Sequence, residues 1–188
     1  MLTGRLVRLR ARTREDVETL YPMTQDPELG SLTDDRPWAP RSLPWFQADF
    51  DRRQSDKPGE TSTRHAGFAV QRHDDADGVC IGEVSLWNIN DHQRTARIGI
   101  TLAPGARGQG IGRDCLEVIC RFAFELRNLE RVQLETLACN DAMQRAARAA
   151  GFTEEGRLRS NAWHLGMRVD ELIFGLLAPE WRAAHPRP

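Results

Sequence analysis

The most informative segment of this chain is Ile100-Thr101-Leu102-Ala103-Pro104-Gly105-Ala106-Arg107-Gly108-Gln109-Gly110-Ile111-Gly112. It begins as an apolar strand, turns through several glycines and enters a long helical pattern. Glycine lets the backbone turn tightly and bring its N–H groups close to a ligand, and a helix start adds unpaired amides and the positive end of a dipole. The segment therefore predicts a cradle for a pyrophosphate group, although a plain glycine-rich turn would share the same letters.

The cradle differs from the two best-known phosphate loops. It does not end in the Lys-Ser/Thr pair that a mononucleotide P-loop needs, and its glycines do not read G-x-G-x-x-G as in dinucleotide-binding proteins. The rest of the chain must therefore indicate which phosphate-bearing ligand the cradle binds.

Composition predicts one globular domain over residues 1–188, because 40% of the residues are hydrophobic and 28% are charged. A formal net charge of −1 gives no general attraction to nucleic acid or membrane, so neither is expected as a partner. The N-terminus carries no signal-like or long apolar run, and a cytoplasmic location is expected. Four scattered cysteines predict buried, reduced thiols rather than disulfides or a metal site: Cys80, Cys115, Cys120 and Cys139.

The pattern of apolar and turn-forming residues predicts the elements before the glycine segment. We expect a strand at 4–10, a helix from Thr13 to 23 with Asp16 in a capping box, irregular structure at 24–44, a short helix at 45–54 and a surface loop at 53–64. Three antiparallel strands should follow at 66–72, 79–88 and 94–102.

After the segment, helical spacing of apolar residues extends over 110–127, followed by a strand at 132–138. A second helix runs from Asn140 to Gly151, a residue suited to a left-handed C-cap, and strands are expected at 152–161 and 168–177. The order β-α-α-β-β-β-α-β-α-β-β predicts an α+β fold.

Two motifs resemble the GNAT superfamily of N-acyltransferases. Arg107, Gly110 and Gly112 occupy the defining positions of its acyl-CoA loop, Arg/Gln-x-x-Gly-x-Gly/Ala. Asn140 after a strand and Gly151-Phe152 at the end of the next helix resemble its second signature. The resemblance extends over residues 2–181. Within it the opening 4–10, Ile81-Gly82-Glu83 and the closing 170–181 resemble the RimJ/RimL-like branch, named for ribosomal-protein N-terminal acetyltransferases.

The resemblance implies a mixed, mostly antiparallel seven-stranded sheet with helices on both faces. Its central parallel strands, 94–102 and 132–138, should splay apart so that an acyl-CoA thioester reaches the middle of the sheet. The pyrophosphate would bind loop amides without a metal, and the strand edge would pair with the pantetheine arm. The expected cofactor-binding residues are Ile100, Leu102, Arg107, Gly108, Gln109, Gly110, Ile111, Gly112 and Asn140.

Three residues are expected to take part in catalysis. The Leu102 amide would donate to the developing oxyanion, and Asn140 would bind the pantetheine or a bridging water, although a plain helix N-cap explains Asn140 equally well. Glu83 is the first candidate base for the acceptor's ammonium proton, unless it merely faces solvent. His92, in an Asn/Asp-rich corner, is the second, with a solvated histidine as the simpler interpretation.

The chain departs from the family pattern at three positions. Many relatives place a tyrosine in the last helix as the acid for the leaving thiolate, and some RimL-like members place a serine three residues after the motif Asn. This chain has Ala147 and Met143 there, and its single tyrosine, Tyr21, is elsewhere. Arg97 replaces the branch's frequent glutamate before Ile-Gly. A thiolate is a good leaving group, so water could suffice to protonate it.

The acceptor side is less determined. Asp26, Glu28, Asp34 and Asp35 lie in a segment with no basic residue between 24 and 35, and it would attract a cationic amine unless it is an ordinary solvated loop. Trp38 and Trp87 are expected to line the acceptor groove, with Trp45, Phe46 and Trp163 as further candidates. For each of these rings, core packing is the simpler alternative.

Together these residues predict an N-acyltransferase that moves an acetyl or other short acyl group from acyl-CoA to a primary amine, such as a protein N-terminus. A small-molecule acyltransferase for aminoglycoside-like or polyamine substrates is the alternative enzyme. An acyl-CoA-binding sensor is an alternative from another class, because the usual Tyr and Ser are missing. The donor, acetyl or succinyl, and the existence of a homodimer stay open.

Overall fold

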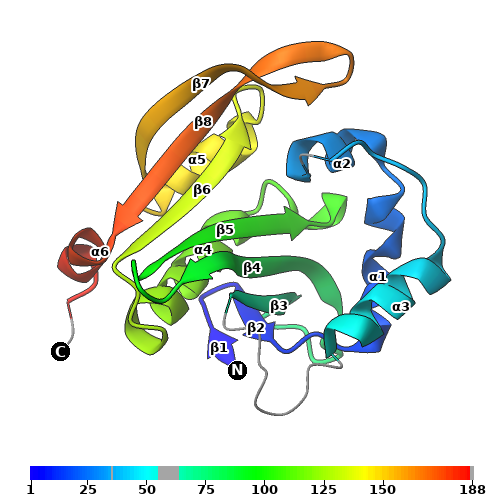
Figure 1. The fold of residues 1–188 in the computed structure, drawn as a ribbon. Helices are drawn as coiled ribbons and strands as arrows, with labels where there is room; N and C mark the ends of the chain where they lie inside the picture. The colour runs from blue at the N-terminus through cyan, green and yellow to red at the C-terminus, as the bar shows by residue number, and fades with distance from the viewer. Residues whose placement is uncertain (35, 55–63, 187–188) are drawn as a thin grey trace.

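An eight-stranded sheet in the order β1-β2-β3-β4-β5-β6-β8-β7 forms the centre of this computed structural model (Figure 1). The structure describes residues 1–34, 36–54 and 64–186. The strands are β1 (Leu2–Thr3), β2 (Val7–Arg10), β3 (His65–Arg72), β4 (Cys80–Asn90), β5 (Thr95–Leu102), β6 (Arg131–Leu137), β7 (Thr153–His164) and β8 (Met167–Leu177). All neighbours are antiparallel except β5 and β6. The predicted mixed α+β fold is confirmed.

The sheet has one strand more than the seven predicted, because the chain turns back between β1 and β2. The N–H groups of residues 5, 6 and 7 donate to the Asp114 carboxylate at 2.7–3.0 Å, and Gly4 N–H donates to Val7 O at 2.8 Å. A Cβ at Gly4 would lie 2.4 Å from Asp114 Oδ2, so only glycine fits this approach. Asp114, which holds this turn, is more than 100 residues away in the sequence, so the local sequence pattern does not predict the turn.

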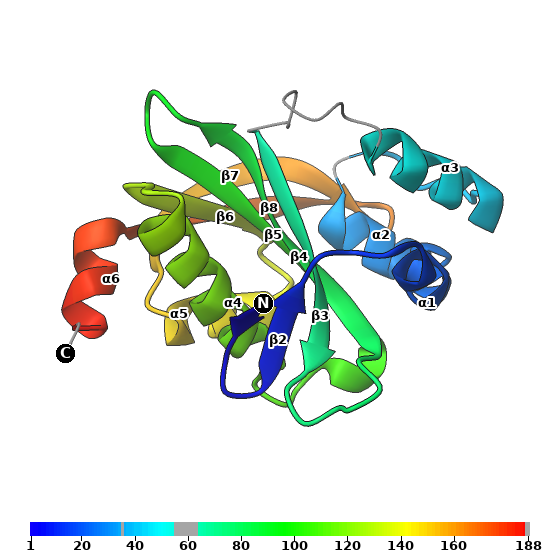
Figure 2. The same cartoon turned by 90° about the horizontal axis from the view of Figure 1, so that it is seen from below.

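Helices cover both faces of the sheet, as predicted: α1, α2 and α3 lie on one side and α4 and α5 on the other (Figure 2). Their bounds are α1 (Arg14–Thr24), α2 (Pro27–Thr33), α3 (Leu43–Gln54), α4 (Ile111–Arg121), α5 (Asp141–Ala149) and α6 (Ala178–Ala184), with a 3-10 turn η1 (Pro104–Ala106) and a π turn η2 (Phe122–Leu126) that continues α4.

Two helices were not predicted. Helix α2 lies inside the segment expected to be irregular, where Asp26 accepts from the N–H groups of Glu28 and Leu29 and Pro27 takes the first helical position. Helix α6 follows β8, and its Glu180 accepts from Leu177 N–H at 2.8 Å. Both have seven residues, too few for apolar periodicity to stand out. The predicted loop at 53–64 falls mostly outside the described residues.

The main core lies between the sheet and helices α4 and α5. Its largest fully buried side chains include Leu86, Ile111, Leu116, Ile119, Leu134 and Phe174. A smaller cluster under α1 joins Leu20, Ala69 and Cys80. Burial raises the pKa of the Cys115 and Cys120 thiols, which keeps them protonated. Cys139 is exposed, so the prediction of a buried thiol is wrong there, because the residue lies in the turn after β6.

Candidate active site

The central feature is a split between the parallel strands β5 and β6, which Figure 1 shows as two diverging arrows. They pair only at Thr95↔Arg131, Ala96↔Val132 and Arg97↔Gln133, and β5 then continues to Leu102 without a partner on that side. Ala103 N–H donates to Ile81 O of β4 at 2.9 Å. Because backbone groups alternate along a strand, those of Leu102 and Ile100 face the split. The predicted splay of the central strands is confirmed.

The glycine loop follows β5 at the open end of this split. Gly108 and Gly110 have φ of +74° and +79°, in the left-handed region that favours glycine. A Cβ at Gly108 would meet nothing within 4 Å, and one at Gly110 would meet only Leu6 Cδ1, so the outer side of the loop is open. The first backbone bond of α4 runs from Asp114 N–H to Gly110 O at 3.1 Å. The first amides of α4, before Asp114, have no carbonyl partner within the helix.

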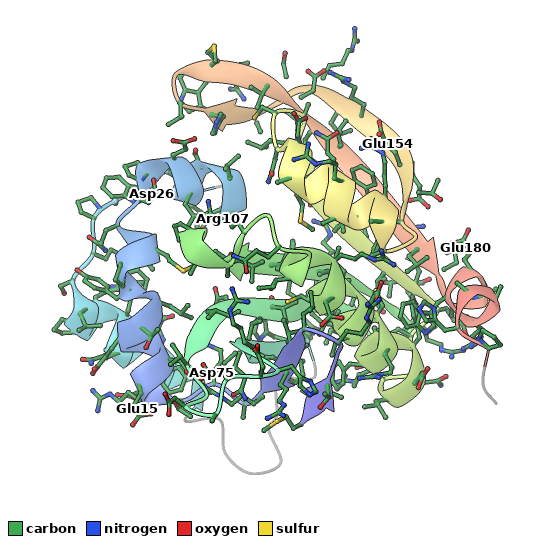
Figure 3. All side chains as sticks on the ribbon, turned by 180° about the vertical axis from the view of Figure 1, so that it is seen from behind. Glu15, Asp26, Asp75, Arg107, Glu154 and Glu180 are labelled. Carbon is green, nitrogen blue, oxygen red and sulfur yellow. The ribbon has the colours of Figure 1, made fainter. Side chains whose placement is uncertain are left out.

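Side chains of the loop hold its shape. Arg107 Nε donates to Leu102 O at 2.9 Å, and Gln109 Nε2 donates to Gly105 O at 2.8 Å. Arg72 on β3 donates to Gln109 Oε1 at 2.6 Å. Figure 3 labels Arg107 where β5 leads into the loop. The structure therefore places Arg107 and Gln109 at the cradle as loop-shaping residues, and direct binding of a ligand by them stays a prediction.

Two helix starts meet at the open end of the split, because β5 and β6 are parallel and each is followed by a helix. A Cβ at Gly112 of α4 would lie 3.8 Å from both Ala146 of α5 and Leu102 of β5, so these elements touch there. Asn140 caps α5, with its Oδ1 accepting from Met143 N–H at 3.2 Å. The N-cap role of Asn140 is observed, and its cofactor role stays a prediction.

At the position on α5 where the family resemblance would place an acidic tyrosine, this chain has a buried alanine. Ala147 is fully buried in the main core, and Met143 packs against that core. Tyr21 lies on α1 and donates its hydroxyl to Arg41 O at 3.1 Å. No tyrosine therefore reaches the split, in agreement with the interpretation of the sequence.

One face of the split looks toward helices α1 to α3, and we call it the acceptor face. Register pairs Glu83↔Thr101, Ser85↔Gly99 and Trp87↔Arg97 place these side chains together, since opposite residues share a face. Glu83 also pairs with Ala69, whose side chain lies under α1. The acceptor face thus holds Glu83 and Trp87, two of the predicted site residues.

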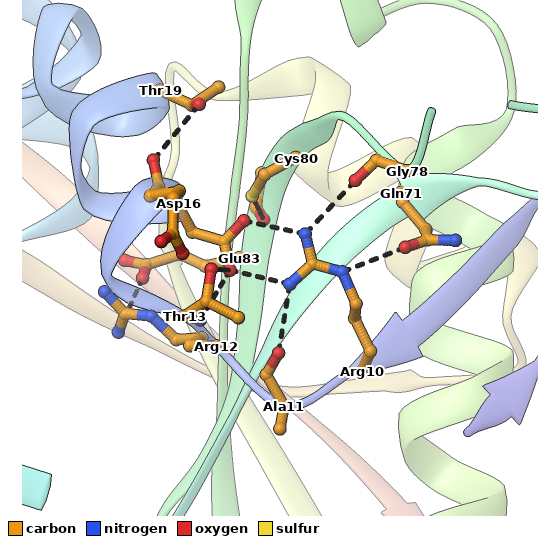
Figure 4. Close-up of polar contacts among 12 residues, drawn as sticks. Arg10, Ala11, Arg12, Thr13, Asp16, Thr19, Gln71, Gly78, Cys80 and Glu83 are labelled. Carbon is orange, nitrogen blue, oxygen red and sulfur yellow. Dashed lines mark hydrogen bonds and ion pairs between the residues drawn. The ribbon is translucent and has the colours of Figure 1, made fainter. Parts of the chain in front are cut away.

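Glu83 is an ion-paired carboxylate. Its Oε2 lies 3.0 Å from Arg12 Nη1, and its side chain is 42% exposed (Figure 4). The Arg12 guanidinium lies 5.8 Å from the centre of the Phe50 ring on α3. The arginine therefore orients Glu83 beside Thr101 on β5. His92 is exposed in the turn between β4 and β5, at the end of β5 away from the glycine loop.

Two of the acidic side chains between residues 24 and 35 already have partners within the protein. Asp26 is used as the cap of α2, and Asp34 receives Nε and Nη2 of Arg36 at 2.9 and 2.7 Å. Arg36 lies one residue after the segment 24–35. The prediction that no basic residue opposes this acidic run is therefore wrong. Asp35 lies outside the described residues. A substrate-binding role for Asp34 stays a prediction.

Helix α2 spans the open end of the acceptor face. It contacts β5, β6 and β7, and Ser31 Oγ lies 2.8 Å from His164 Nδ1 of β7. Trp38 packs against Gly30 of this helix and donates Nε1 to Thr24 O at 3.1 Å. Trp87 instead lies at the split, with Arg97 5.1 Å from its ring centre. The structure separates these two predicted groove residues.

The sequence interpretation missed Glu135 on β6. Its Oε2 accepts from Arg97 Nη1 at 3.1 Å, and its Oε1 accepts from Gln133 Nε2 at 2.8 Å. Alternation along β6 could have indicated it, because residues 131, 133 and 135 are half-exposed between buried neighbours. Its arginine partner is 38 residues away on the neighbouring strand, which local pattern does not reveal.

Within the described part of the chain, no group of three or more His, Cys, Asp or Glu side chains is arranged to hold a metal ion. Among the same residues, no helix has both the length and the apolar character needed to cross a membrane.

A family model described as an acetyltransferase (GNAT) domain matches residues 6–153. The chain is similar to the "Putative ribosomal N-acetyltransferase YdaF" of Bacillus subtilis (strain 168), at 32% identity over 105 residues, which make up 56% of this chain and 57% of that protein. It is also 28% identical over 153 residues to the spermidine N(1)-acetyltransferase of Vibrio cholerae, with 80% of each chain covered.

Among solved structures, the spermidine N-acetyltransferase from Vibrio cholerae in complex with CoA and spermine shares the fold. Its TM-score is 0.80 at 23% identity, with 93% of this chain and 97% of that chain covered. The family model spans far more than half of the sequence and includes the split strands and the glycine loop. This chain belongs to the GNAT acetyltransferase family.

Proposed function

We propose that this protein is an acetyl-CoA-dependent N-acetyltransferase that acts on a primary amine by direct transfer. The observation that carries the proposal is the split between β5 and β6, with the open glycine loop at its end. The pyrophosphate of the cofactor would bind the amides of residues 108–112 at the positive end of α4. The pantetheine arm would pair with the free edge of β5 at Ile100 and Leu102 as an added strand.

The reaction needs an amine without its ammonium proton. The amine nitrogen attacks the thioester carbonyl carbon, a C–N bond forms, and the C–S bond breaks to release the CoA thiolate. Glu83 takes the proton of the ammonium, directly or through water. The Leu102 amide donates to the developing oxyanion, worth about 3 kcal/mol. Water protonates the thiolate, because α5 offers Ala147 where a phenol would be needed.

Two acceptor classes are supported by separate observations. The similarity to a spermidine N(1)-acetyltransferase covers four fifths of both chains and favours a polyamine-like amine. The similarity to a ribosomal N-acetyltransferase, together with the RimJ/RimL-like residues 4–10 and 170–181, favours the α-amine of a protein N-terminus. Both acceptors carry a primary ammonium, so the same acceptor face serves either.

The test is an acceptor panel with acetyl-CoA, in which mass detection of products is combined with measurement of free CoA thiol. Spermidine, an aminoglycoside and a short peptide with a free N-terminus represent the classes. Acetylation of spermidine alone supports the polyamine acceptor, and acetylation of the peptide alone supports the RimJ/RimL-like activity. Thiol release at only the background hydrolysis rate with every acceptor would contradict the enzyme and favour an acyl-CoA-binding sensor.

A further inference from the structure

Glu135 occupies the point where the split opens. The last pair between the two strands is Arg97↔Gln133, and Glu135 is two residues further along β6. Its side chain is 22% exposed, roughly half as accessible as that of Glu83. A carboxylate at this place is partly withdrawn from solvent and still reachable from the acceptor face.

Two neighbours fix the orientation of this carboxylate. Arg97 from β5 donates to Oε2, and Gln133 from β6 donates to Oε1. Arg97 itself lies against the Trp87 ring, which limits its movement. A carboxylate oxygen has two lone pairs, so each oxygen of Glu135 can accept one more hydrogen bond. The arrangement holds the ion-paired carboxylate in place, and each of its oxygens keeps a lone pair for a further hydrogen-bond donor.

The strand opposite Glu135 carries a glycine, which has no side chain of its own, at the level of the carboxylate. Continuing the register past Arg97↔Gln133 sets Gly99 level with Glu135 across the split. A Cβ at Gly99 would lie in van der Waals contact with Ser85 Oγ at 3.4 Å and Trp87 Nε1 at 3.6 Å, so Ser85 and Trp87 line the strand opposite Glu135. Thr101, beside Glu83, is two residues or about 7 Å further along β5.

We propose that Glu135 binds the ammonium group of the acceptor beside Gly99, Ser85 and Trp87 and thereby selects primary amines. Arg97 is its positioning partner, and Glu83 takes the proton once the amine lies between the two carboxylates. This assignment rests on the proposed acetyltransferase function. It gives the two glutamates separate roles, with Glu135 governing acceptor binding and Glu83 governing the rate of transfer.

The test is Glu135→Gln, which keeps the shape of the side chain and removes its charge. Loss of a hydrogen bond to a charged group should raise the KM for the acceptor about 10- to 100-fold. The kcat should change only a few-fold, and the affinity for acetyl-CoA should stay the same. Arg97→Met should raise the acceptor KM less, because the carboxylate remains but is no longer held.

Glu130→Gln is the matched control. Glu130 Oε1 pairs with Arg94 at 2.8 Å where the strands begin, outside the split, so acceptor and donor KM should both equal the wild-type values. A purely structural role of Glu135 would lower Tm and affect both substrates alike. Unchanged acceptor KM in folded Glu135→Gln would overturn the proposal.

A binding measurement separates this proposal from the proposed function. Spermidine and butylamine are titrated by calorimetry into wild type and Glu135→Gln in the presence of CoA, where no transfer occurs. Weaker binding to the variant supports the ammonium site even if the wild type transfers no acetyl group. Equal binding to both proteins, or no binding to the wild type, would overturn the Glu135 assignment even if acetyl transfer to another acceptor is observed.

Discussion

At the scale of single residues, Gly110 meets two demands that only a glycine can meet together. Its φ of +79° is strained for any side chain, and in the proposed binding mode its backbone approaches the pyrophosphate closely. The loop glycines were identified from the sequence because both demands are local. The sequence did not indicate that Arg12 pairs with Glu83 or that Arg97 pairs with Glu135, because the partners in each pair lie on different strands or segments.

Gly110→Asp should abolish measurable binding of acetyl-CoA, because the side chain blocks the approach and its charge repels the phosphates. The measurement is calorimetric titration of acetyl-CoA into protein shown to be folded by circular dichroism. Gly166→Asp is the control, since Gly166 has φ of +87° and open space around it but lies in the turn between β7 and β8. Wild-type affinity in Gly110→Asp would remove the pyrophosphate assignment.

Glu83→Gln should slow the transfer step by about 10²–10⁴-fold while acetyl-CoA still binds normally, because the variant keeps the shape and loses the base. The pH dependence of kcat should change with it. Steady-state rates between about pH 6 and pH 9 give the measurement. A variant that retains full turnover across that range would exclude Glu83 as the proton acceptor, directly or through water.

At the scale of elements, the start of α1 is held by one buried carboxylate. Asp16 accepts from Arg10 Nη1 and Nη2 at 2.7 Å each and from Thr13 N–H at 2.7 Å (Figure 4). Burial alone would raise the pKa of Asp16, but the hydrogen bonds from Arg10 and Thr13 outweigh it, so the pKa lies below its ordinary value of 3.8.

Asp16→Asn should lower the free energy of unfolding by about 2–3 kcal/mol at pH 7, because it leaves Arg10 without its anion. A folded-state pKa below the unfolded one stabilises the protein above pH 3.8, and this contribution is lost as the pH falls through the folded value. Urea unfolding at several pH values checks the sign. A difference between wild type and variant that widens toward acid would contradict it.

Some helices and strands could be predicted from the local sequence pattern, and others could not. Alternation located β3 to β8 within a few residues, because their side chains face either a core or solvent. The turn between β1 and β2 depends on Asp114 of α4, and the short helix α2 depends on its Asp26-Pro27 cap. Glu135 was not predicted as a site residue, because its position depends, like that turn, on a residue far away in the sequence: Arg97 on the neighbouring strand.

At the scale of the whole molecule, one parallel pair in an otherwise antiparallel sheet creates the site. Strands β1 to β4 hold β5 on one side, and β8 with β7 holds β6 on the other, so the two can diverge without loss of the fold. Helix α4 follows β5 and helix α5 follows β6. Helix α2 contacts both strands and spans the open end of the split. The glycine loop and the acceptor face thus belong to one framework of sheet and helices.

The most direct test of this account is a coupled measurement on the wild-type protein with acetyl-CoA and a primary amine that it accepts. Free CoA thiol and N-acetylated product are quantified in the same reaction. Direct transfer should give equal amounts of both, and no acetyl group on the protein, Cys139 included, when the amine is withheld. Thiol release without acetylated amine, or an acetylated protein that forms before the amine is added, would contradict direct transfer at the split.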